Sequence, residues 1–255
     1  MKSQIDLIIH SKFVIPVIPE NMVLQDYSLA IDKGRIVAIG PTKELQSNWH
    51  PKEEEFLQNH LVLPGFVNCD AQITQNLLKI LQINESLAPE HGSIKNIQDS
   101  MLDENFVSDA CVVGIHELIR KGITCFGHNV IFPEAMISTA KSIGIKLQVG
   151  LVLQNKKSNY AKEFGDYLRL GLSIRDKYKD LPSLKFAFSI DQNDSVKSEQ
   201  LSITAKYANE LEMPIHIVFH NNADVKFVLE SLESAGALNE QTQLSGIQSI
   251  ADDFC

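Results

Sequence analysis

The chain has 255 residues, of which 44% are hydrophobic and 22% are charged, as in a globular protein with one large domain or two smaller ones. Its formal net charge of −9, with the lysines scattered, argues against nucleic acid or an anionic membrane as a partner. Four cysteines share no Cys-x-x-Cys spacing, which favours reduced thiols over a zinc knuckle or a redox dithiol. Two prolines interrupt the apolar run at 13–19, so we predict a cytoplasmic protein without a signal or membrane segment.

The first part of the chain has the pattern of a small β module. Short apolar runs with the composition of strands lie at 5–9, 13–18, 27–31 and 35–39. Lys33-Gly34 predicts a tight hairpin between the last two, since glycine accepts the positive φ of such turns. The polar segment at 46–55, with three consecutive glutamates, is predicted to be a surface connection. We place the boundary of this module at about residue 60.

From residue 61 onward, strand-like runs alternate with amphipathic segments. Strands are predicted at 61–67, 123–126, 145–152, 184–190 and 213–219. Helices are predicted at 105–121, 133–142, 160–178 and 198–212. Each helix passes to the next strand through a polar turn that often contains glycine or proline. This alternation predicts parallel βα units, arranged either as a barrel or as a doubly wound sheet.

Short motifs along the chain carry a more specific signal. They are DKGRIVAIG at 32–40, LVLPGFVN at 61–68, GITCF at 122–126, FPEA at 132–135, KFAF at 185–188 and PIHI at 214–217. In this order they resemble the amidohydrolase superfamily, in the chlorohydrolase and aminohydrolase branch that includes methylthioadenosine/adenosylhomocysteine deaminases. The resemblance implies an α/β chain with an incomplete β-sandwich module at 1–60 and a partial (β/α)8 barrel of five to six units at 61–255. A complete barrel needs about 250 residues, more than follow residue 60.

The resemblance assigns the chemistry of that family to a few positions. In the family, imidazoles in the barrel mouth hold a divalent metal (Zn, Fe or Mn), which activates water for attack on a C–N or similar bond. The first ligand pair follows Pro-Gly-x-Val-Asn, and those two positions are Asp70 and Gln72 here. A later ligand histidine falls on Val218, and the glutamate that handles protons falls on Asn221. A valine cannot bind a metal.

Two further positions of the family's site have also changed. A histidine that contacts substrate matches Asp191, and the ligand on the sixth strand matches Gly246. The aspartate of the eighth strand is expected beyond Cys255, so the chain has the pattern of a truncated relative. We therefore expect a catalytically degenerate homologue with no metal or other cofactor, which acts as a binding or assembly partner or has no selected role.

One alternative keeps the enzyme with a rebuilt site. Asp70, Asp191, His216 and His220 would supply oxygen and imidazole ligands for Mn, Fe or Zn. His216, Val218 and His220 share one face of the predicted strand, because side chains alternate along a strand. In this alternative the chain is a deaminase or related C–N hydrolase for a purine-nucleoside-like or triazine-like ring.

Side chains at the predicted mouth are also candidates for contacts with a small-molecule ligand. His128 follows a strand-like run and would lie where the strands of a barrel end. The remaining candidates for such contacts are Asp191, His216 and His220.

A nucleophilic alternative would use a thiol beside a charged or basic neighbour. Cys69 adjoins Asp70, and Cys125 lies three residues before His128. Neither pair has a recognisable third group to orient it. We therefore predict that both cysteines are buried and inert.

A third class of function is that of an interaction subunit. A barrel with fewer than eight strands has an unpaired strand edge, which pairs with another strand unless it is covered. The expected partners are a second copy of the chain, giving a homo-oligomer, or a separate chain that supplies the missing strands. Neither nucleic acid nor a membrane is expected as a partner.

Overall fold

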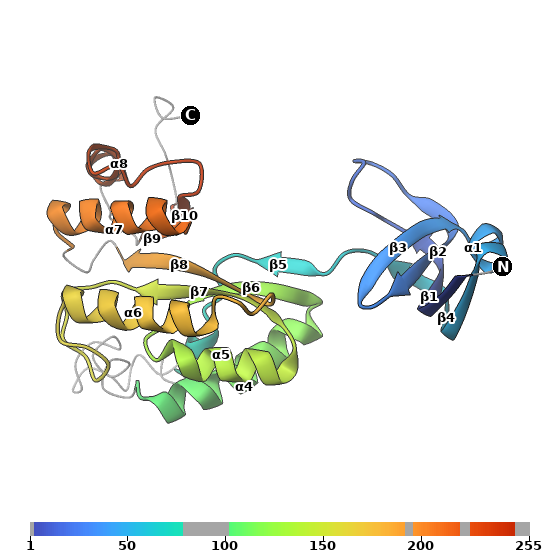
Figure 1. Cartoon of the computed structure of the whole chain (residues 1–255), viewed down its shortest axis with the longest axis horizontal. Coiled ribbons are helices and arrows are strands. Elements are labelled where there is room, and N and C mark those ends of the chain that lie inside the picture. The colour runs from blue at the N-terminus through green and yellow to red at the C-terminus, as the bar shows by residue number, and fades with distance from the viewer. Residues whose placement is uncertain (1–2, 79–101, 192–195, 220–224, 248–255) are drawn as a thin grey trace, which may run out of the picture. The chain divides into compact units, whose positions relative to one another are not determined.

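A computed structural model describes residues 3–78, 102–191, 196–219 and 225–247 of the chain (Figure 1). The chain divides into two compact units, Met1–Gly65 and Phe66–Cys255. Each unit has its own hydrophobic core. The two units are therefore described separately.

The first unit is a four-stranded mixed sheet in the order β3-β2-β1-β4, with one short helix (Figure 1). Its elements are β1 (Ser3–Val14), β2 (Leu24–Asp32), β3 (Arg35–Pro41), α1 (Thr42–Asn48) and β4 (Trp49–Val62). Lys33 and Gly34 form the predicted hairpin turn between β2 and β3, with φ of 50° and 72°. Two positive φ values give the turn type that matches the twist of the flanking strands. Leu45 of α1 packs on Ile8 and Ala30 to form the small core.

The prediction that residues 46–55 form a surface connection is wrong. This segment contains the start of β4, which pairs in parallel with β1, and Glu53, Glu54 and Glu55 lie within the strand. Strand β4 is at the edge of the sheet. An edge strand tolerates proline and several charged side chains, because one side of it has no partner strand. The predicted strands at 5–9 and 13–18 are also replaced by the single strand β1.

The second unit is a parallel six-stranded sheet in the order β10-β9-β8-β7-β6-β5. Its elements are β5 (Phe66–Asn68), the 3-10 helix η1 (Ile73–Leu78), α4 (Glu104–Arg120), β6 (Ile123–Asn129), α5 (Pro133–Ile143), β7 (Lys146–Val152), α6 (Phe164–Tyr178), β8 (Leu184–Asp191), α7 (Ser198–Leu211), β9 (Ile215–Val218), α8 (Val225–Ser234) and β10 (Gln243–Ser245). Neighbouring strands are consecutive in the sequence. A doubly wound sheet reverses its strand order at one point, whereas a barrel does not. The order therefore selects the barrel.

Local sequence signals set the ends of the helices in this unit. The side chain of Asp103 accepts a hydrogen bond from the backbone N–H of Phe106 at 2.7 Å and caps the start of α4. Pro133 begins α5, where its fixed φ suits the first turn. Gly144 ends α5 with a φ of 84°, a conformation that favours glycine. In the described part of the chain, no helix is long and apolar enough to cross a membrane.

Two side-chain contacts show that the sheet is curled. The Gln148 amide on β7 donates a hydrogen bond to Gln243 on β10 at 2.7 Å. The Asn129 amide on β6 lies 3.0 Å from Nδ1 of His216 on β9. In each case two strands lie between the partners in the sheet, so the contacts must cross a concave interior. The predicted fold class, a partial (β/α)8 barrel preceded by a small β module, is confirmed.

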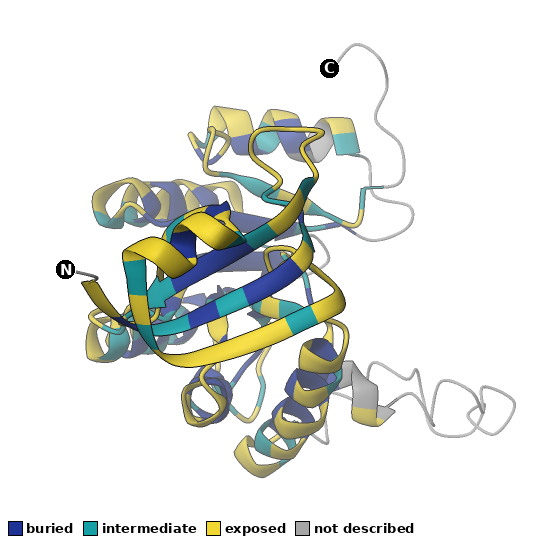
Figure 2. Cartoon of the chain, turned by 90° about the vertical axis from the view of Figure 1, so that its right-hand side faces the viewer, coloured by how far each residue is buried: buried dark blue, intermediate teal, exposed yellow. Residues whose placement is uncertain are grey.

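The apolar core of the second unit lies between the sheet and its helices, where buried residues concentrate (Figure 2). A Cβ added at Gly171 of α6 would lie 3.3 Å from Cβ of Leu151, so α6 packs closely on β7. Side chains that alternate with this core point into the concave interior. They include Ser189 and His216, which are 3% and 4% exposed. Complete barrels fill this space mainly with branched apolar side chains, whereas these two side chains are polar.

Candidate site at the mouth of the half-barrel

The carboxyl ends of the barrel strands bring several predicted site positions to one edge of the sheet. Asp70 lies just beyond β5, and Asp191 and Val218 are the last residues of β8 and β9. Asp191 and Val218 are also direct partners in the register of the two strands. Gly246 directly follows β10. Barrel proteins place their functional residues at this edge, so it is the candidate site.

Asp70 and Gln72, at the positions of the first ligand pair, are joined to each other. The Gln72 amide donates a hydrogen bond to Oδ1 of Asp70 at 3.0 Å. The backbone N–H of Asp70 donates to the side-chain oxygen of Asn68 at 3.2 Å. The N–H of Ala71 donates to the carbonyl of Gly127 on β6 at 2.8 Å. These bonds hold the segment after β5 against the neighbouring strand.

Both ring nitrogens of His216 have hydrogen-bond partners. Nδ1 contacts the amide of Asn129, and Nε2 lies 2.9 Å from the hydroxyl of Ser245. Burial lowers the pKa of His216, while the negative charge of Asp70 acts in the opposite direction. A metal could bind this imidazole only if one of these hydrogen bonds broke.

His128 lies in a different environment from the other candidates. It follows Gly127 on β6 and, by the alternation of side chains, faces away from the interior to which Asn129 points. Its Nε2 lies 3.3 Å from the hydroxyl of Thr74, and within the described residues its Nδ1 has no hydrogen-bond partner. Burial lowers the pKa of His128 to about 4, although the backbone of Ala71 and the charge of Asp70 oppose this shift.

The lowered pKa of His128 predicts a loss of stability in mild acid. Below the ordinary histidine pKa of 6.5, the unfolded chain binds a proton that the folded chain, with a pKa of about 4, does not. Stability is therefore lost as the pH falls from 6.5 toward 4. The free energy of unfolding should fall by about 2 kcal/mol between about pH 7 and about pH 5 through this group alone.

Urea denaturation across that pH range checks this expectation. The variant His128→Gln should lose less stability in acid than the original chain, because it removes the group that titrates. The control His116→Gln changes an exposed histidine on α4 and should keep the original pH dependence. If the free energy of unfolding of both variants fell equally with pH, His128 would not be buried as a neutral ring.

Two predicted ligand positions offer no donor atom. Val218 has an aliphatic side chain. Gly246 has a φ of 76°, and a Cβ there would lie 2.1 Å from the backbone oxygen of Phe219. A side chain at this position would therefore need a shift of the backbone. The predicted positions His220 and Asn221 lie outside the described residues.

The cysteines give no support to a thiol nucleophile. Neither Cys69 nor Cys125 is buried as predicted, because Cys69 is exposed and Cys125 is half-buried. Cys125 and His128 are an odd number of residues apart on β6, so they point to opposite faces of the sheet. Burial raises the pKa of Cys125, and it raises the pKa of Cys111 to about 12. A reactive cysteine needs the opposite shift.

Sequence reasoning missed the polar pairs that cross the interior. Asn129 and Ser245 hold His216 from either side, and Gln148 meets Gln243. One signal was present, because Gln and Gly alternate with apolar residues along 146–152. That alternation indicates a strand with one polar face. It does not indicate which distant side chain each polar residue would meet.

Solved structures of known enzymes share this fold. An adenosine deaminase from Xanthomonas campestris with bound zinc matches with a TM-score of 0.90 at 22% identity, over 100% of this chain and 60% of that one. A mutant of the atrazine chlorohydrolase TrzN from Arthrobacter aurescens, complexed with zinc and atraton, matches with a TM-score of 0.76 at 16% identity, over 93% of this chain and 60% of that one. The chain has the fold of the amidohydrolases, and the resemblance predicted from its motifs is confirmed.

The chain is also similar to curated sequences. The chain is 27% identical over 229 residues to a 5-methylthioadenosine/S-adenosylhomocysteine deaminase from Saccharophagus degradans, covering 87% of this chain and 50% of that protein. It is 27% identical over 223 residues to the deaminase of the same name from Teredinibacter turnerae, covering 86% of this chain and 50% of that protein. The chain thus spans about half the length of the curated relatives it matches. No family model matches it.

The zinc of those solved structures does not fit the residues described here. In the described residues, no group of three or more His, Cys, Asp and Glu side chains could hold a metal ion. Asp70 accepts a hydrogen bond from Gln72, and His216 uses both of its nitrogens. A zinc site needs at least three converging donors. No reaction step at this mouth is therefore assigned to a metal.

Proposed function

We propose that this chain is a non-hydrolytic relative of the amidohydrolases, whose half-barrel mouth binds a small molecule without cleaving it. The similarity to deaminases and to a chlorohydrolase is that of the curated sequences and solved structures named above. The loss of hydrolysis is our inference from this chain's own residues. The positions matched to metal ligands are Asp70, Gln72, Val218 and Gly246, and none of them is a histidine.

The close approach at Gly246 carries this proposal. At Asp70 or Gln72, a single substitution could restore an imidazole to an existing turn. At Gly246 the backbone of Phe219 occupies the space of a side chain, since a Cβ would lie 2.1 Å from the carbonyl oxygen of Phe219. Backbone atoms cannot rotate away as the end of a side chain can. This close approach supports the proposal, because a ligand side chain does not fit at this position without a shift of the backbone.

A deaminase assay tests the proposal. The purified chain, supplied with zinc, should leave 5-methylthioadenosine and adenosine unchanged, because no set of donors among the described residues can hold a metal that would activate a water molecule. Conversion to the inosine product is followed by the ultraviolet absorbance of the purine. The Saccharophagus degradans deaminase, assayed in parallel, serves as the positive control. Turnover that a chelator abolishes, and that Asp70→Asn also abolishes, would contradict the proposal.

A second candidate, the rebuilt enzyme, is favoured by one observation. The charge of Asp70 acts on the pKa of both His128 and His216, so this carboxylate is electrostatically close to two imidazoles. A hydrolase acting on a purine-nucleoside-like or triazine-like ring would use Asp70 and His216, with Asp191 at the neighbouring strand end. The same assay, extended to atraton as a triazine, separates this candidate from the first.

The sheet edges support a third candidate, an interaction subunit. Among the described strands, β5 and β10 each have a partner on one side only. An uncovered edge can pair with another chain, so a second copy or a separate chain could complete the barrel. Light scattering during gel filtration measures the mass of the particle. A multiple of the mass of one chain supports a homo-oligomer, and a monomer rules out a second copy as the partner.

A further inference from the structure

A cavity of about 750 Å3 lies in the first unit, and its lining includes none of the residues of the candidate site at the barrel mouth. It is bounded by β1, β2, α1 and β4. Its volume falls in the range of sites for small molecules, which is about 300–1,000 Å3. All of its lining residues belong to one unit, so the cavity does not depend on how the two units are arranged.

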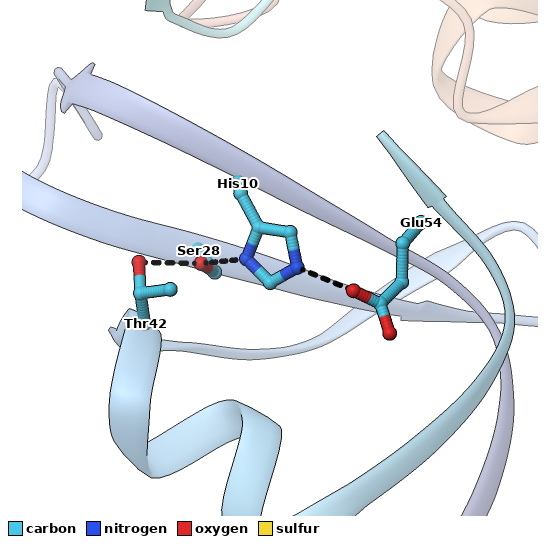
Figure 3. Close-up of polar contacts among 4 residues, drawn as sticks. All are labelled: His10, Ser28, Thr42 and Glu54. Atoms are coloured by element: carbon cyan, nitrogen blue, oxygen red, sulfur yellow. Dashed lines mark hydrogen bonds and ion pairs between the residues drawn. The ribbon is translucent and has the colours of Figure 1, made fainter. Parts of the chain in front are cut away.

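The wall of this cavity contains a histidine held on both sides (Figure 3). Nδ1 of His10 lies 2.7 Å from the hydroxyl of Ser28, and Nε2 lies 3.1 Å from Oε2 of Glu54. The Ser28 hydroxyl continues the chain of contacts to the hydroxyl of Thr42 at 2.8 Å. His10 is 5% exposed. These contacts come from β1, β2, β4 and α1, and together they fix the orientation of the imidazole.

The same contacts raise the question of a hydrolytic triad. Serine, histidine and glutamate are the residue types of such triads. Ser28, however, is 0% exposed, so its hydroxyl cannot reach a substrate. The role of the network is therefore to fix the wall of the cavity rather than to supply a nucleophile.

Phe56 provides an aromatic platform next to this histidine. Its ring stacks on His10, with ring centroids 4.6 Å apart and an interplanar angle of 25°. Although one face is covered in this way, Phe56 remains 58% exposed and lines the cavity. Because His10 is fixed by its hydrogen bonds, the stacked phenyl ring is held in place before any ligand arrives. Preorganisation of this kind lowers the entropic penalty of binding.

Two lysines give the cavity a positive rim. Lys12 and Lys43 both line it, and among the described residues neither forms an ion pair. Asp26 is the one carboxylate of the lining, so the cationic side chains exceed the anionic ones. This local excess stands out in a chain whose formal net charge is −9. Nζ of Lys12 lies over the ring of Phe13, 5.6 Å from its centroid, which leaves its positive charge in place. Ammonium groups that are not neutralised by a carboxylate attract anions to a neighbouring cavity.

We infer that this cavity binds a small planar anion, an aryl phosphate or an aryl carboxylate. The aromatic ring of the ligand stacks on Phe56, and its anionic group contacts Lys12 and Lys43. Both parts of the ligand are needed, because a surface phenyl ring or an exposed lysine alone gives little affinity. The inference does not rest on the function proposed for the barrel mouth.

A titration of the full chain, labelled with 15N and followed by amide chemical shifts, tests this inference. Phenyl phosphate combines both parts of the ligand, whereas inorganic phosphate and phenol each supply one. Phenyl phosphate should bind at least about tenfold more tightly than either part, with shifts centred on His10 and Phe56. Benzoate, run in parallel, tells whether the site prefers carboxylate or phosphate. The absence of saturable shifts with both aryl anions would overturn the inference.

Matched variants locate the binding. The double variant Lys12→Gln/Lys43→Gln should weaken phenyl phosphate binding at least about tenfold, because it removes both cations. The control Lys141→Gln/Lys157→Gln makes the same change in charge on exposed lysines of the second unit and should bind as the original chain does. Phe56→Leu should weaken phenyl phosphate more than inorganic phosphate. Equal affinity in both double variants would show that the anion binds elsewhere.

Discussion

Substituting histidine for Gly246 is expected to destabilise the second unit rather than to restore a metal ligand. The residue has a φ of 76°, and its Cβ would lie 2.1 Å from the backbone oxygen of Phe219. The left-handed conformation alone costs about 1 kcal/mol for a non-glycine residue. Relief of the overlap requires β10 to move away from β9. Together these effects should lower the free energy of unfolding by about 3–5 kcal/mol.

Gly236 offers a matched control for this substitution. Its φ is 69°, but a Cβ there would have no atom within 4 Å. Gly236→His should therefore lower the free energy of unfolding by only about 1 kcal/mol, which is the cost of the left-handed backbone conformation. Urea denaturation followed by helical circular dichroism compares the two variants. If the free energy of unfolding fell by the same amount in both variants, the close contact at Gly246 would not exist. The position could then accept a ligand histidine.

Truncating Phe188 to alanine is expected to lower the free energy of unfolding of the second unit by about 3–5 kcal/mol. Phe188 is 0% exposed. It lies in β8, which is hydrogen-bonded to β7 on one side and β9 on the other. Removing the ring leaves a cavity in the layer between the sheet and its helices, and the strands on both sides limit how far that layer can collapse.

Two spectroscopic signals separate the units in this experiment. The chain has one tryptophan, Trp49, which packs on the core of the first unit, whereas most helical residues lie in the second. Phe188→Ala should shift the transition seen by circular dichroism much more than the one seen by fluorescence. Ile203→Ala, at a residue of α7 that is 43% exposed, should change stability by less than about 0.5 kcal/mol. A small effect of Phe188→Ala would mean that β8 is not central to the core.

Local patterns were sufficient to predict most of the barrel unit. The predicted helices at 133–142 and 198–212 correspond to α5 (Pro133–Ile143) and α7 (Ser198–Leu211), because amphipathic periodicity and end signals act over a few residues. Strand β4 was missed, since its polar composition reflects its place at the edge of a sheet. Helix α8 and strand β10 were missed as well. Periodicity alone left the choice between a barrel and a doubly wound sheet open. The resemblance of the motifs implied the barrel, and the order of the strands confirms it.

The candidate site was predictable in position but not in its contacts. Motif matches placed Asp70, Asp191 and Val218 at strand ends, and the structure has them there. The contacts of His216 with Asn129 and Ser245 join residues that are 87 and 29 positions apart in the sequence. Such pairs depend on the curvature of the sheet. Local alternation shows only that a side chain faces inward, and not which side chain it will meet.

The zinc content of a repaired variant tests the central claim most directly. Asp70→His/Gln72→His restores the first ligand pair, while Val218 and Gly246 remain unable to bind a metal. After equilibrium dialysis against zinc, elemental analysis should find far less than one zinc per chain in both the original protein and the variant. About one tightly bound zinc per chain in either would contradict the account of a mouth that has lost its metal site.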